Sequence, residues 1–480
     1  MRQRFWGWLD DRSGIQAMLH ALLYERLPRK IGWLHVLGSG ALFLFTVQVL
    51  TGMLLAMNYV PSTSEAYESV QYITKEVPFG KIVRGFHYWG ASLMVIVVVL
   101  HMLRVFVMGA YKKPRELTWL VGVMLFVLTL GFAFTGYLLP YDQKAYWATK
   151  VGVSFVGYVP FIGEHLKHIL YGGEELGAPT LTRFYAIHVL LLPLLTIPLI
   201  AIHLMLMRRK GEMPPGAEAD EESHVEKPIT FYPHQLLKDL VFAGVLLILL
   251  FLLPFVWGVH TEPPADPTDT TYLPRPEWYF LPLFQLEKVQ IGKVVLFGGA
   301  RVWLGTVLIP ALFVLLLFAL PFLDRSPSRR PRRRLPMLLG AGVLLALTVW
   351  LGIEAKVETD RERAHLAKGS DTPRFTGLAA VGQRLVMDRC LRCHRVDGQG
   401  SRKAPEFVRL APGESSPWTK DQLVLYLVNP KETHPNTVMP TAKELGLTSL
   451  DQLEAVAEYL LHYKPIPRKR GTSSSSYHLE

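Results

Sequence analysis

The chain has 480 residues, of which 50% are hydrophobic, and its mean hydropathy is +0.23. This composition excludes an ordinary soluble enzyme and indicates that the long apolar runs cross a membrane. A formal net charge of +11 would suit a nucleic-acid partner if the basic residues were gathered in one patch. They lie between the apolar runs instead, so we expect membrane lipid around the chain and no nucleic acid.

Seven apolar segments have the length of about 20 residues that a helix needs to cross a bilayer. When the N-terminus is placed in the cytoplasm, the cytoplasmic segments carry 19 Lys and Arg residues and the opposite loops carry 9. The positive-inside rule then puts everything after the seventh span outside the cytoplasm. We therefore expect an all-α, multi-pass protein of a bacterial inner membrane. The predicted spans are residues 33–58, 85–109, 117–139, 181–207, 236–258, 301–323 and 336–353.

Residues 1–32 precede the first span and carry no evident cleavable signal peptide. They mix Trp, Asp, Arg and Leu without a compact apolar core or a small-residue cleavage site. This pattern favours an amphipathic helix at the membrane surface, and the first span itself would serve as the insertion signal.

Two pairs of histidines lie inside the spans, His87 with His101 and His188 with His203. A lone His in an apolar segment is most often a core residue, but ionisable groups in a bilayer normally face a partner or a ligand. Spacings of 14 and 15 residues keep both members of a pair within roughly 60° of one helix face and about 21–22 Å apart. Two such helices, packed side by side, predict two stacked bis-imidazole sites for two non-covalent b-type haems. By the predicted topology, the outer site holds His87 and His188, and the inner site holds His101 and His203.

Glycines repeat with the same period on the flanking spans. Gly38 and Gly52 are 14 residues apart on the first span, and Gly122 and Gly136 are 14 apart on the third. A missing side chain lets a large planar ring approach the backbone, which favours haem clearance. Tight helix–helix packing through small residues is the alternative.

Two arginines stand just before the outer histidines. Arg84 precedes His87, and Arg183 precedes His188. Either guanidinium could pair with a haem propionate. Snorkelling of the side chain to the interface is the competing interpretation.

The two cysteines of the chain form the motif Cys390-Leu-Arg-Cys393-His394. Two thiols two residues apart and followed by His match the attachment site of a covalent c-type haem, whose iron the His ligates. A redox pair or half of a zinc site is the alternative. The predicted topology places this segment outside the cytoplasm, where c-type haem is attached, and a second cysteine pair for zinc is absent.

Together these motifs make the chain resemble a known family. Residues 1–210 resemble the short, plastid-type cytochrome b of the cytochrome bf complexes, in SVQYITKEVPFGKIVRGFHYWGAS, KKPRELTWLVGV, FTGYLLPYDQ and TLTRFYAIHVLLLPLL. Residues 236–353 are similar to its partner, subunit IV, in ADP at 265–267, PRPEWYFLPLFQL at 274–286 and PFLDR at 321–325. The C-terminal part resembles a class I cytochrome c. The 15-residue spacing of the second histidine pair is similar to the plastid and Gram-positive type, whereas the mitochondrial type uses 14.

The resemblance implies a fused chain: a four-helix haem-binding bundle, three further transmembrane helices and a soluble cytochrome c domain. We expect the di-haem domain in residues 1–210, a cytoplasmic loop in 211–235 and the subunit IV-like domain in 236–355. A polar linker, 356–376, is expected to lead to the cytochrome c domain, 377–466, and a tail, 467–480. Met439, 45 residues after His394, resembles the methionine loop and is expected as the sixth iron ligand, with His434 as rival. Helical spacing predicts a closing helix from Ser449 to Tyr463.

The segment Pro276-Glu277-Trp278-Tyr279 follows the fifth span, on the predicted outer side. Quinol oxidation releases two protons and two electrons, and a carboxylate at the membrane surface can accept a hydroxyl proton. Glu277 fits that role, which the resemblance implies for this motif. A Glu at a helix start after Pro is the alternative.

Near the inner histidines, Arg208 and His20 are candidates to contact and protonate a quinone being reduced. The alternative for Arg208 is an anchor on the cytoplasmic side of the membrane. The alternative for His20 is a position on a surface helix without a role in quinone binding. The plastid family carries a Cys two residues before the first-span glycine, holding an extra covalent haem. Val36 stands there in this chain and excludes covalent, though not non-covalent, attachment of such a haem.

These observations predict the membrane subunit of a quinol:cytochrome c, or similar soluble acceptor, oxidoreductase that translocates protons. A Rieske cluster needs Cys₂His₂ ligation, and both cysteines are committed, so a separate Rieske protein is expected. The quinone pool and a soluble cytochrome c or similar acceptor are the other partners, and the resemblance implies a homodimeric complex. The alternative is a haem conduit without a quinol site, which would have no use for Glu277. A transporter would not explain the haem-attachment motif.

Overall fold

The computed structural model describes residues 2–28, 31–211, 213, 228–269, 272–288, 293–295, 301–371, 377–391, 394–396, 399–400, 418–434, 437 and 439–463. The chain forms two compact units. The first comprises Met1–Ala265 and Pro274–Val357, and the second comprises Asp266–Leu273 and Glu358–Glu480.

Within the described residues, seven helices are long and apolar enough to cross a membrane, which confirms the predicted number of spans. They agree with the prediction because each contains an apolar stretch of 18 residues with at most two charged side chains. The sixth starts later than predicted, since Arg301–Trp303 form a strand (β4) that pairs with Lys293–Val295 (β3). The segments are Trp33–Ala56, Gly80–Val107, Glu116–Tyr137, Ala178–Lys210, Phe231–Val256, Gly305–Leu323 and Pro331–Ala364.

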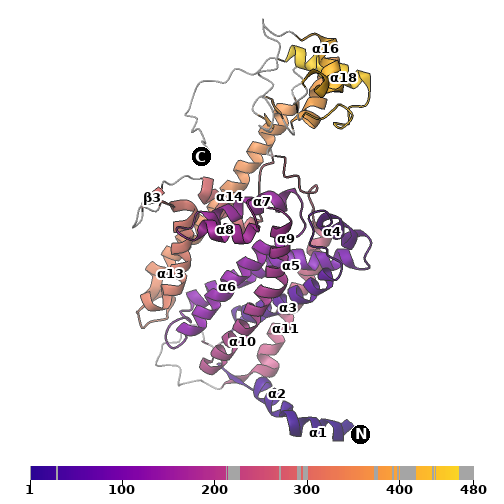
Figure 1. Cartoon of the computed structure of the whole chain (residues 1–480). Coiled ribbons are helices and arrows are strands. Elements are labelled where there is room, and N and C mark those ends of the chain that lie inside the picture. The colour runs from indigo at the N-terminus through magenta and orange to yellow at the C-terminus, as the bar shows by residue number, and fades with distance from the viewer. Residues whose placement is uncertain are drawn as a thin grey trace. The chain divides into compact units, whose positions relative to one another are not determined.

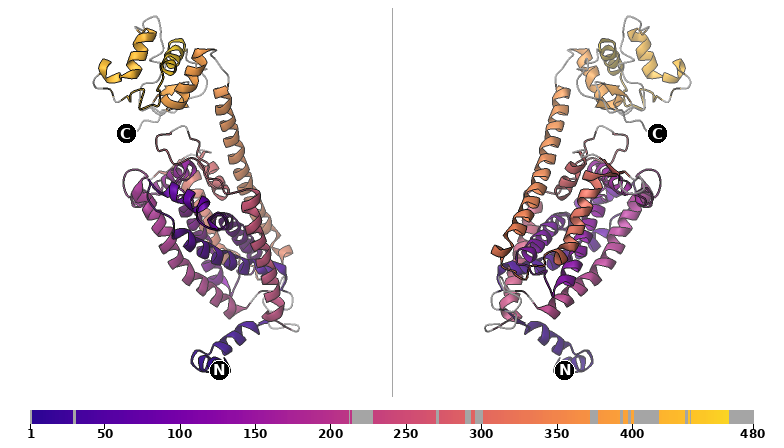
Figure 2. Two further views of the ribbon diagram at one scale, coloured as in Figure 1. Left: turned by 90° about the vertical axis from the view of Figure 1, so that its right-hand side faces the viewer. Right: turned by 90° about the vertical axis from the view of Figure 1, so that its left-hand side faces the viewer.

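Four of these segments form a bundle in which helices run side by side (Figures 1 and 2). α3 (Val36–Ala56) packs on α5 (Gly80–Val107), α5 packs on α6 (Glu116–Tyr137), and α6 packs on α10 (Leu192–Lys210). α9 (Ala178–Ala186) and a π-helical turn, η2 (Ile187–Leu191), lead into α10. A short 3-10 turn, η1 (Trp33–His35), leads into α3.

The remaining spans pack around this bundle. α11 (Leu236–Val256), entered through the π-helical turn η4 (Phe231–Gln235), packs on α3 and α5. Leu44 of α3, Val97 of α5 and Leu250 of α11 are buried together in their core. α13 (Ile309–Leu323), preceded by the π-helical turn η7 (Leu304–Leu308), packs on α6.

Short helices cover one end of the bundle (Figure 1). They are α4 (Ala66–Lys75), α7 (Gln143–Gly157) and α8 (Gly163–Tyr171), which the sequence did not predict. η5 (Trp278–Phe280) and α12 (Leu281–Lys288) follow the fifth span. At the opposite end lie α1 (Arg2–Ser13) and α2 (Ile15–Leu23), the predicted surface segment. It is two helices, because Gly14 adopts φ 61°, a left-handed conformation that ends α1.

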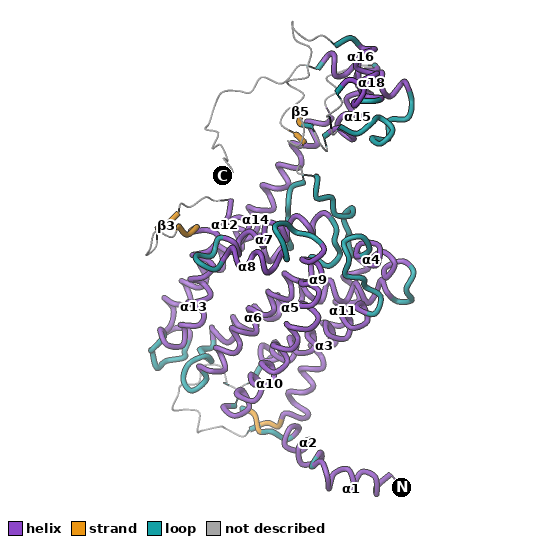
Figure 3. Tube along the Cα trace, viewed as in Figure 1, coloured by secondary structure: helices purple, strands orange, loops and turns teal. Residues whose placement is uncertain are grey.

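Strands are few among the described residues (Figure 3). β1 (Arg26–Leu27) pairs antiparallel with β2 (Ile229–Thr230), and β5 (Arg395–Val396) pairs antiparallel with β6 (Gln399–Gly400). The β1–β2 pair ties the segment before the first span to the segment before the fifth.

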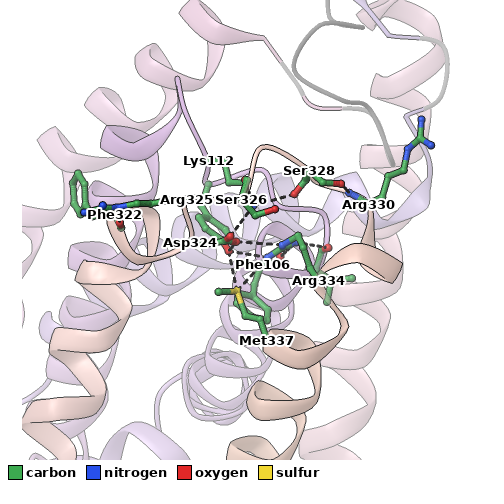
Figure 4. Close-up of polar contacts among 12 residues, drawn as sticks. Phe106, Lys112, Phe322, Asp324, Arg325, Ser326, Ser328, Arg330, Arg334 and Met337 are labelled. Carbon is green, nitrogen blue, oxygen red and sulfur yellow. Dashed lines mark hydrogen bonds and ion pairs between the residues drawn. The ribbon is translucent and has the colours of Figure 1, made fainter.

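A buried polar cluster joins the loop after α5 to the hairpin between α13 and α14 (Figure 4). Asp324 accepts from Lys112 Nζ at 2.8 Å, from Arg334 Nε at 3.2 Å and from the Tyr111 hydroxyl. Lys112 also donates to the carbonyls of Ser326 and Ser328. A buried ion pair needs such additional hydrogen bonds to offset the free-energy cost of removing both charges from water.

The last span continues past the membrane-length segment. After the 3-10 turn η8 (Pro331–Arg334), α14 runs from Leu335 to Asp371. The helix therefore passes through most of the predicted linker, 356–376. Residues 355–366 contain no Pro or Gly and are rich in Ala, Glu, Lys and Arg, which are strong helix formers.

The second unit is a small helical domain. α15 (Leu378–Leu385), continued by the π-helical turn η9 (Val386–Cys390), packs against α18 (Leu450–His462). α18 confirms the helix predicted from Ser449 to Tyr463, and the Ser449 side chain caps its start by accepting from the Gln452 N–H. Gly382 makes the close crossing possible, because a Cβ there would lie 1.8 Å from the carbonyl oxygen of Ala455. α16 (Lys420–Val428) and α17 (Pro430–Thr433) complete the described helices.

Candidate haem and quinol sites

A single cavity of about 1180 Å³ runs through the four-helix bundle. Glu277 and Tyr279 line one end of it, and Arg208 and Met213 line the other. We name these the Glu277 end and the Arg208 end. The side chains that line the space between them include His87, His101, His188 and His203 and four glycines, Gly38, Gly52, Gly122 and Gly136.

The histidines face one another in two pairs across the cavity. The ring centres of His87 and His188 are 6.3 Å apart, and those of His101 and His203 are 6.4 Å apart. The planes of both pairs cross at 72°. Two imidazoles on opposite sides of one metal, with metal–nitrogen bonds of about 2.0–2.1 Å, have ring centres roughly 6 Å apart. Each pair therefore has the spacing of a bis-imidazole iron site, at two levels of the bundle.

The π-helical turn explains how unequal spacings give equal geometry. In an uninterrupted α-helix, a spacing of 14 residues rotates the second His to about 40° short of a whole number of turns relative to the first. A spacing of 15 residues rotates it to about 60° past that point. The 15-residue pair contains the π-turn Ile187–Leu191, which includes His188 itself. Such a turn holds one more residue than an α-turn and absorbs the insertion. Both levels consequently present the same ring arrangement.

A threonine orients each histidine at the Glu277 end. Thr51 Oγ1 lies 3.0 Å from His87 Nδ1, and Thr135 Oγ1 lies 3.0 Å from His188 Nδ1. Each hydroxyl already donates to a backbone carbonyl, that of Val47 or Gly131, so it accepts from the imidazole N–H. The hydrogen is thereby fixed on Nδ1, which leaves the Nε2 lone pair for iron.

The other pair is held differently. Nδ1 of His101 and of His203 is buried without a hydrogen-bond partner among the described residues. The two levels thus differ in the groups around their ligands, although their ring geometry is the same. The sequence did not reveal the threonines, because their meaning depends on which helix faces which histidine.

Each glycine predicted for haem clearance lies against one imidazole. A Cβ on Gly136 would lie 2.7 Å from Cε1 of His188, and one on Gly52 would lie 3.2 Å from Cε1 of His87. Gly38 and Gly122 stand in the same relation to His101 and His203, at 3.2 and 3.3 Å. The four glycines lie at the predicted levels of the bundle. A side chain at any of them would contact the imidazole that faces it.

The two arginines predicted for propionates are placed differently. Arg84 lines the cavity, where it donates to Thr74 Oγ1 at 3.0 Å and Thr261 Oγ1 at 2.7 Å. The exposed Arg183 donates to the carbonyls of His168 and Ile169 in the last turn of α8 and is not among the cavity-lining residues. The structure therefore brings only Arg84 to the cavity, since carbonyls at the α8 terminus attract the Arg183 cation.

Glu277 lies at the turn into η5, with Pro276 buried before it and Trp278 exposed after it. Its Oε1 accepts from Lys144 Nζ at 2.5 Å. Tyr279 is partly buried at the same end, and its burial together with the Glu277 carboxylate raises the pKa of Tyr279 well above its ordinary value. The Trp278 indole donates to Ser92 Oγ at 3.4 Å. A carboxylate, a cation and a phenol that stays neutral thus meet beside the His87–His188 pair.

At the Arg208 end the structure brings only part of the predicted set together. Arg208 lines the cavity, with its guanidinium 3.9 Å from the Glu25 carboxylate. His20 is exposed on α2, where its ring packs on Tyr24 at 4.7 Å, and it is not among the cavity-lining residues.

Sequence reasoning missed a polar group at the Arg208 end. Asp239 accepts from Ser39 Oγ at 2.9 Å and from Gln235 Nε2 at 2.9 Å, and all three residues line the cavity. An acidic residue near the start of a predicted span was the available signal. Asp239 is therefore a further acidic group at the wall of the cavity.

In the second unit, Cys390 and His394 are both buried, and the His394 N–H donates to the Cys390 carbonyl at 2.9 Å. Cys393 lies outside the described residues. Met439 is partly buried against the domain core. His434, the rival ligand, is exposed and packs its ring against Trp418 and Tyr426. The burial of Met439 favours it as the sixth ligand.

Comparison with known families accounts for most of the chain. Residues 23–211 match the model described as cytochrome b/b6/petB, residues 264–369 match cytochrome b(C-terminal)/b6/petD, and residues 379–464 match cytochrome c. The menaquinol:cytochrome c reductase cytochrome b subunit of Geobacillus thermodenitrificans is 44% identical over 219 residues, which are 44% of this chain and 98% of that protein. The chain belongs to the cytochrome b family.

Further relatives match a longer part of this chain. The cytochrome bc complex cytochrome b subunit of Chlorobaculum thiosulfatiphilum is 34% identical over 355 residues, 72% of this chain and 79% of that protein. A solved structure of a hyperthermophilic respiratory Complex III is similar with a TM-score of 0.65 and 31% identity, covering 73% of this chain and 91% of that one. These matches confirm the predicted family and the all-α membrane fold, and they imply b-type and c-type haems.

Proposed function

We propose that the chain is the membrane core of a proton-translocating quinol:cytochrome c, or similar soluble acceptor, oxidoreductase. The main support for this proposal is the continuous cavity. In it, two histidine pairs with the spacing of bis-imidazole iron sites separate Glu277 from Arg208 and Asp239. The relatives named as menaquinol:cytochrome c reductase subunits support this reading.

The residues divide the work between the ends of the cavity. At the Glu277 end, Glu277 accepts a hydroxyl proton of quinol, and Tyr279 stays neutral beside it. At the Arg208 end, Arg208 binds a quinone as a cation and hydrogen-bond donor, and the carboxyl group of Asp239 supplies a proton to it. His87 with His188 and His101 with His203 would hold two b-type haems, which would supply electron transfer between these ends. Cys390, Cys393 and His394 would hold a c-type haem, which would supply an acceptor for electrons from a separate Rieske protein.

The orientation in the membrane and the partners are part of the same proposal. The basic residues put the N-terminus and the Arg208 end at the cytoplasmic face of a bacterial inner membrane, and the Glu277 end and the cytochrome c domain on the opposite side. The working complex is a homodimer in contact with the quinone pool and a soluble acceptor. The alternative is a haem conduit without a quinol site. Such a conduit would not require the Lys144–Glu277 pair at the cavity wall.

The test is quinol-dependent reduction of the c haem in the purified complex. Glu277→Gln should lower the rate by roughly 10²–10⁴, the usual contribution of a general base. Glu164→Gln, on the exposed surface of α8, is the control and should behave as wild type. The preparation should hold two b haems per c haem, and His101→Leu should remove one b haem while the covalent haem stays. A Glu277→Gln complex with intact haems, a bound Rieske protein and wild-type turnover would support the conduit.

A further inference from the structure

Lys144 is the residue that holds Glu277, and its own position is closely defined. It lies in the first turn of α7, whose start is capped by Asp142 through the Ala145 N–H at 2.8 Å. The second oxygen of Asp142 accepts from the Glu262 N–H at 3.0 Å, which fixes this turn to the loop after the fifth span. The side chains of Lys144 and Glu277 are only 27% and 16% exposed.

The electrostatics of the pair favour a charged lysine. Burial alone would lower the pKa of Lys144, but the Glu277 carboxylate, with smaller contributions from Tyr88 and Asp142, raises it above its ordinary value. Tyr137 on α6 and Tyr279 also lie within electrostatic reach of Glu277. Lys144 is therefore a cation at neutral pH, and its Nζ lies 2.5 Å from Glu277 Oε1.

Proton uptake changes this contact. When Glu277 accepts a proton, the O–H bond of the quinol breaks and an O–H bond forms on the carboxyl group, which becomes neutral. The quinol electrons leave to the acceptors of the proposed function. A neutral carboxyl group no longer attracts the ammonium as a charge, so the protonated side chain is freer to turn away from Lys144.

We propose that Lys144 is a positioning residue for quinol oxidation, which holds the ionised Glu277 at the cavity and releases it once it carries the proton of the quinol. This inference rests on the proposed role of Glu277. The competing explanation is a purely structural link between α7 and the turn before η5. A structural link would affect stability without altering the dependence of the rate on pH.

The experiment measures quinol-dependent c-haem reduction between acidic and alkaline pH for the whole complex. Lys144→Met removes the cation beside the carboxylate that accepts the proton, so the acid-side midpoint of the rate profile should move to higher pH. The maximal rate should fall with little change in KM, and Lys144→Arg should restore the profile at least in part. Lys150→Met is the matched control, because Lys150 stands on the same helix over the Trp147 ring, at 5.0 Å from its centre. It should keep the wild-type profile.

A double variant separates this inference from the function on which it rests. In a Glu277→Gln background, Lys144→Met should cause no further shift of the profile, because the group through which it acts is gone. A wild-type profile for Lys144→Met with intact haems, or a shift that persists in the Glu277→Gln background, would overturn the role of Lys144 alone. A Glu277→Gln complex that itself turns over normally would overturn the proposed function.

Discussion

The hydroxyl of Thr135 lies 3.0 Å from Nδ1 of His188. Thr51 stands in the same relation to His87, so both imidazoles at the Glu277 end have the same tautomer. His101 and His203 have no such partner among the described residues. The two histidine pairs therefore differ in the side chains behind their rings.

Thr51→Val should weaken haem binding at the Glu277 end. Loss of a partner behind a metal-bound histidine typically lowers affinity or activity by about 10–100-fold. The haem-to-protein ratio and a redox titration of the b haems measure the effect. Thr129→Val is the matched control, because Thr129 lines the same cavity and its hydroxyl donates only to the carbonyl of Leu125 among the described residues. Equal haem loss in both variants would contradict the role of Thr51.

Gly136→Ala should displace His188. The added Cβ would lie 2.7 Å from the imidazole, closer than real Cβ contacts, so the ring must move. We expect loss of one b haem in the pyridine haemochrome spectrum and retention of the c haem. Gly131→Ala, on the same helix, places its Cβ 3.6 Å from Leu192 and should retain both b haems.

Met439→Ala should lower the reduction potential of the c haem, because a Met/His pair raises it. His434→Ala should leave the potential unchanged, since His434 is exposed and packs on Trp418. Potentiometric titration of the complex distinguishes the two. A fall in potential on removal of His434 alone would assign the ligand to His434.

Asp324→Asn should destabilise the membrane unit by about 3–5 kcal/mol, because it leaves Lys112 and Arg334 buried without their anion. Thermal unfolding in detergent measures this loss. Arg325→Gln, on the exposed side of the same hairpin, is the control. Should both variants melt alike, the ion pairs contribute little to stability.

The same carboxylate predicts a pH dependence. Burial alone would raise the pKa of Asp324, but bonds and charges from Lys112, Tyr111 and Arg334 lower it below the ordinary value. A carboxylate with a lowered folded-state pKa stabilises the fold above its unfolded pKa of about 3.9, and that stability is lost as the pH falls through the folded pKa. The effect of Asp324→Asn should therefore be constant across neutral pH and diminish only in strong acid.

Protease added to intact spheroplasts should release a haem-bearing fragment from the region after residue 356. This follows from 19 basic residues on the predicted cytoplasmic side against 9 on the other. Haem staining of the released peptide is the measurement. Cleavage only from inverted vesicles would reverse the orientation.

Sequence alone was sufficient for features that depend on local composition. Span positions follow from apolar runs, and the histidine and glycine levels follow from helical period, as with Gly136 beside His188. Lys144, Thr51 and Asp239 were not predicted, because their roles depend on a partner from another helix. Arg183 and His20 stand at suitable sequence positions, yet the fold turns both away from the cavity.

The π-turn Ile187–Leu191 also bears on how such a chain can change length. A residue lost from this turn would convert it to an ordinary α-turn and give the 14-residue interval of His87 and His101. Leu190, which is 68% exposed, is a suitable residue to delete. Helices whose histidines stand 14 or 15 positions apart can therefore present the same two ring positions. The π-turn can thus absorb one additional residue in this helix without a change in the distance between the two levels of histidines.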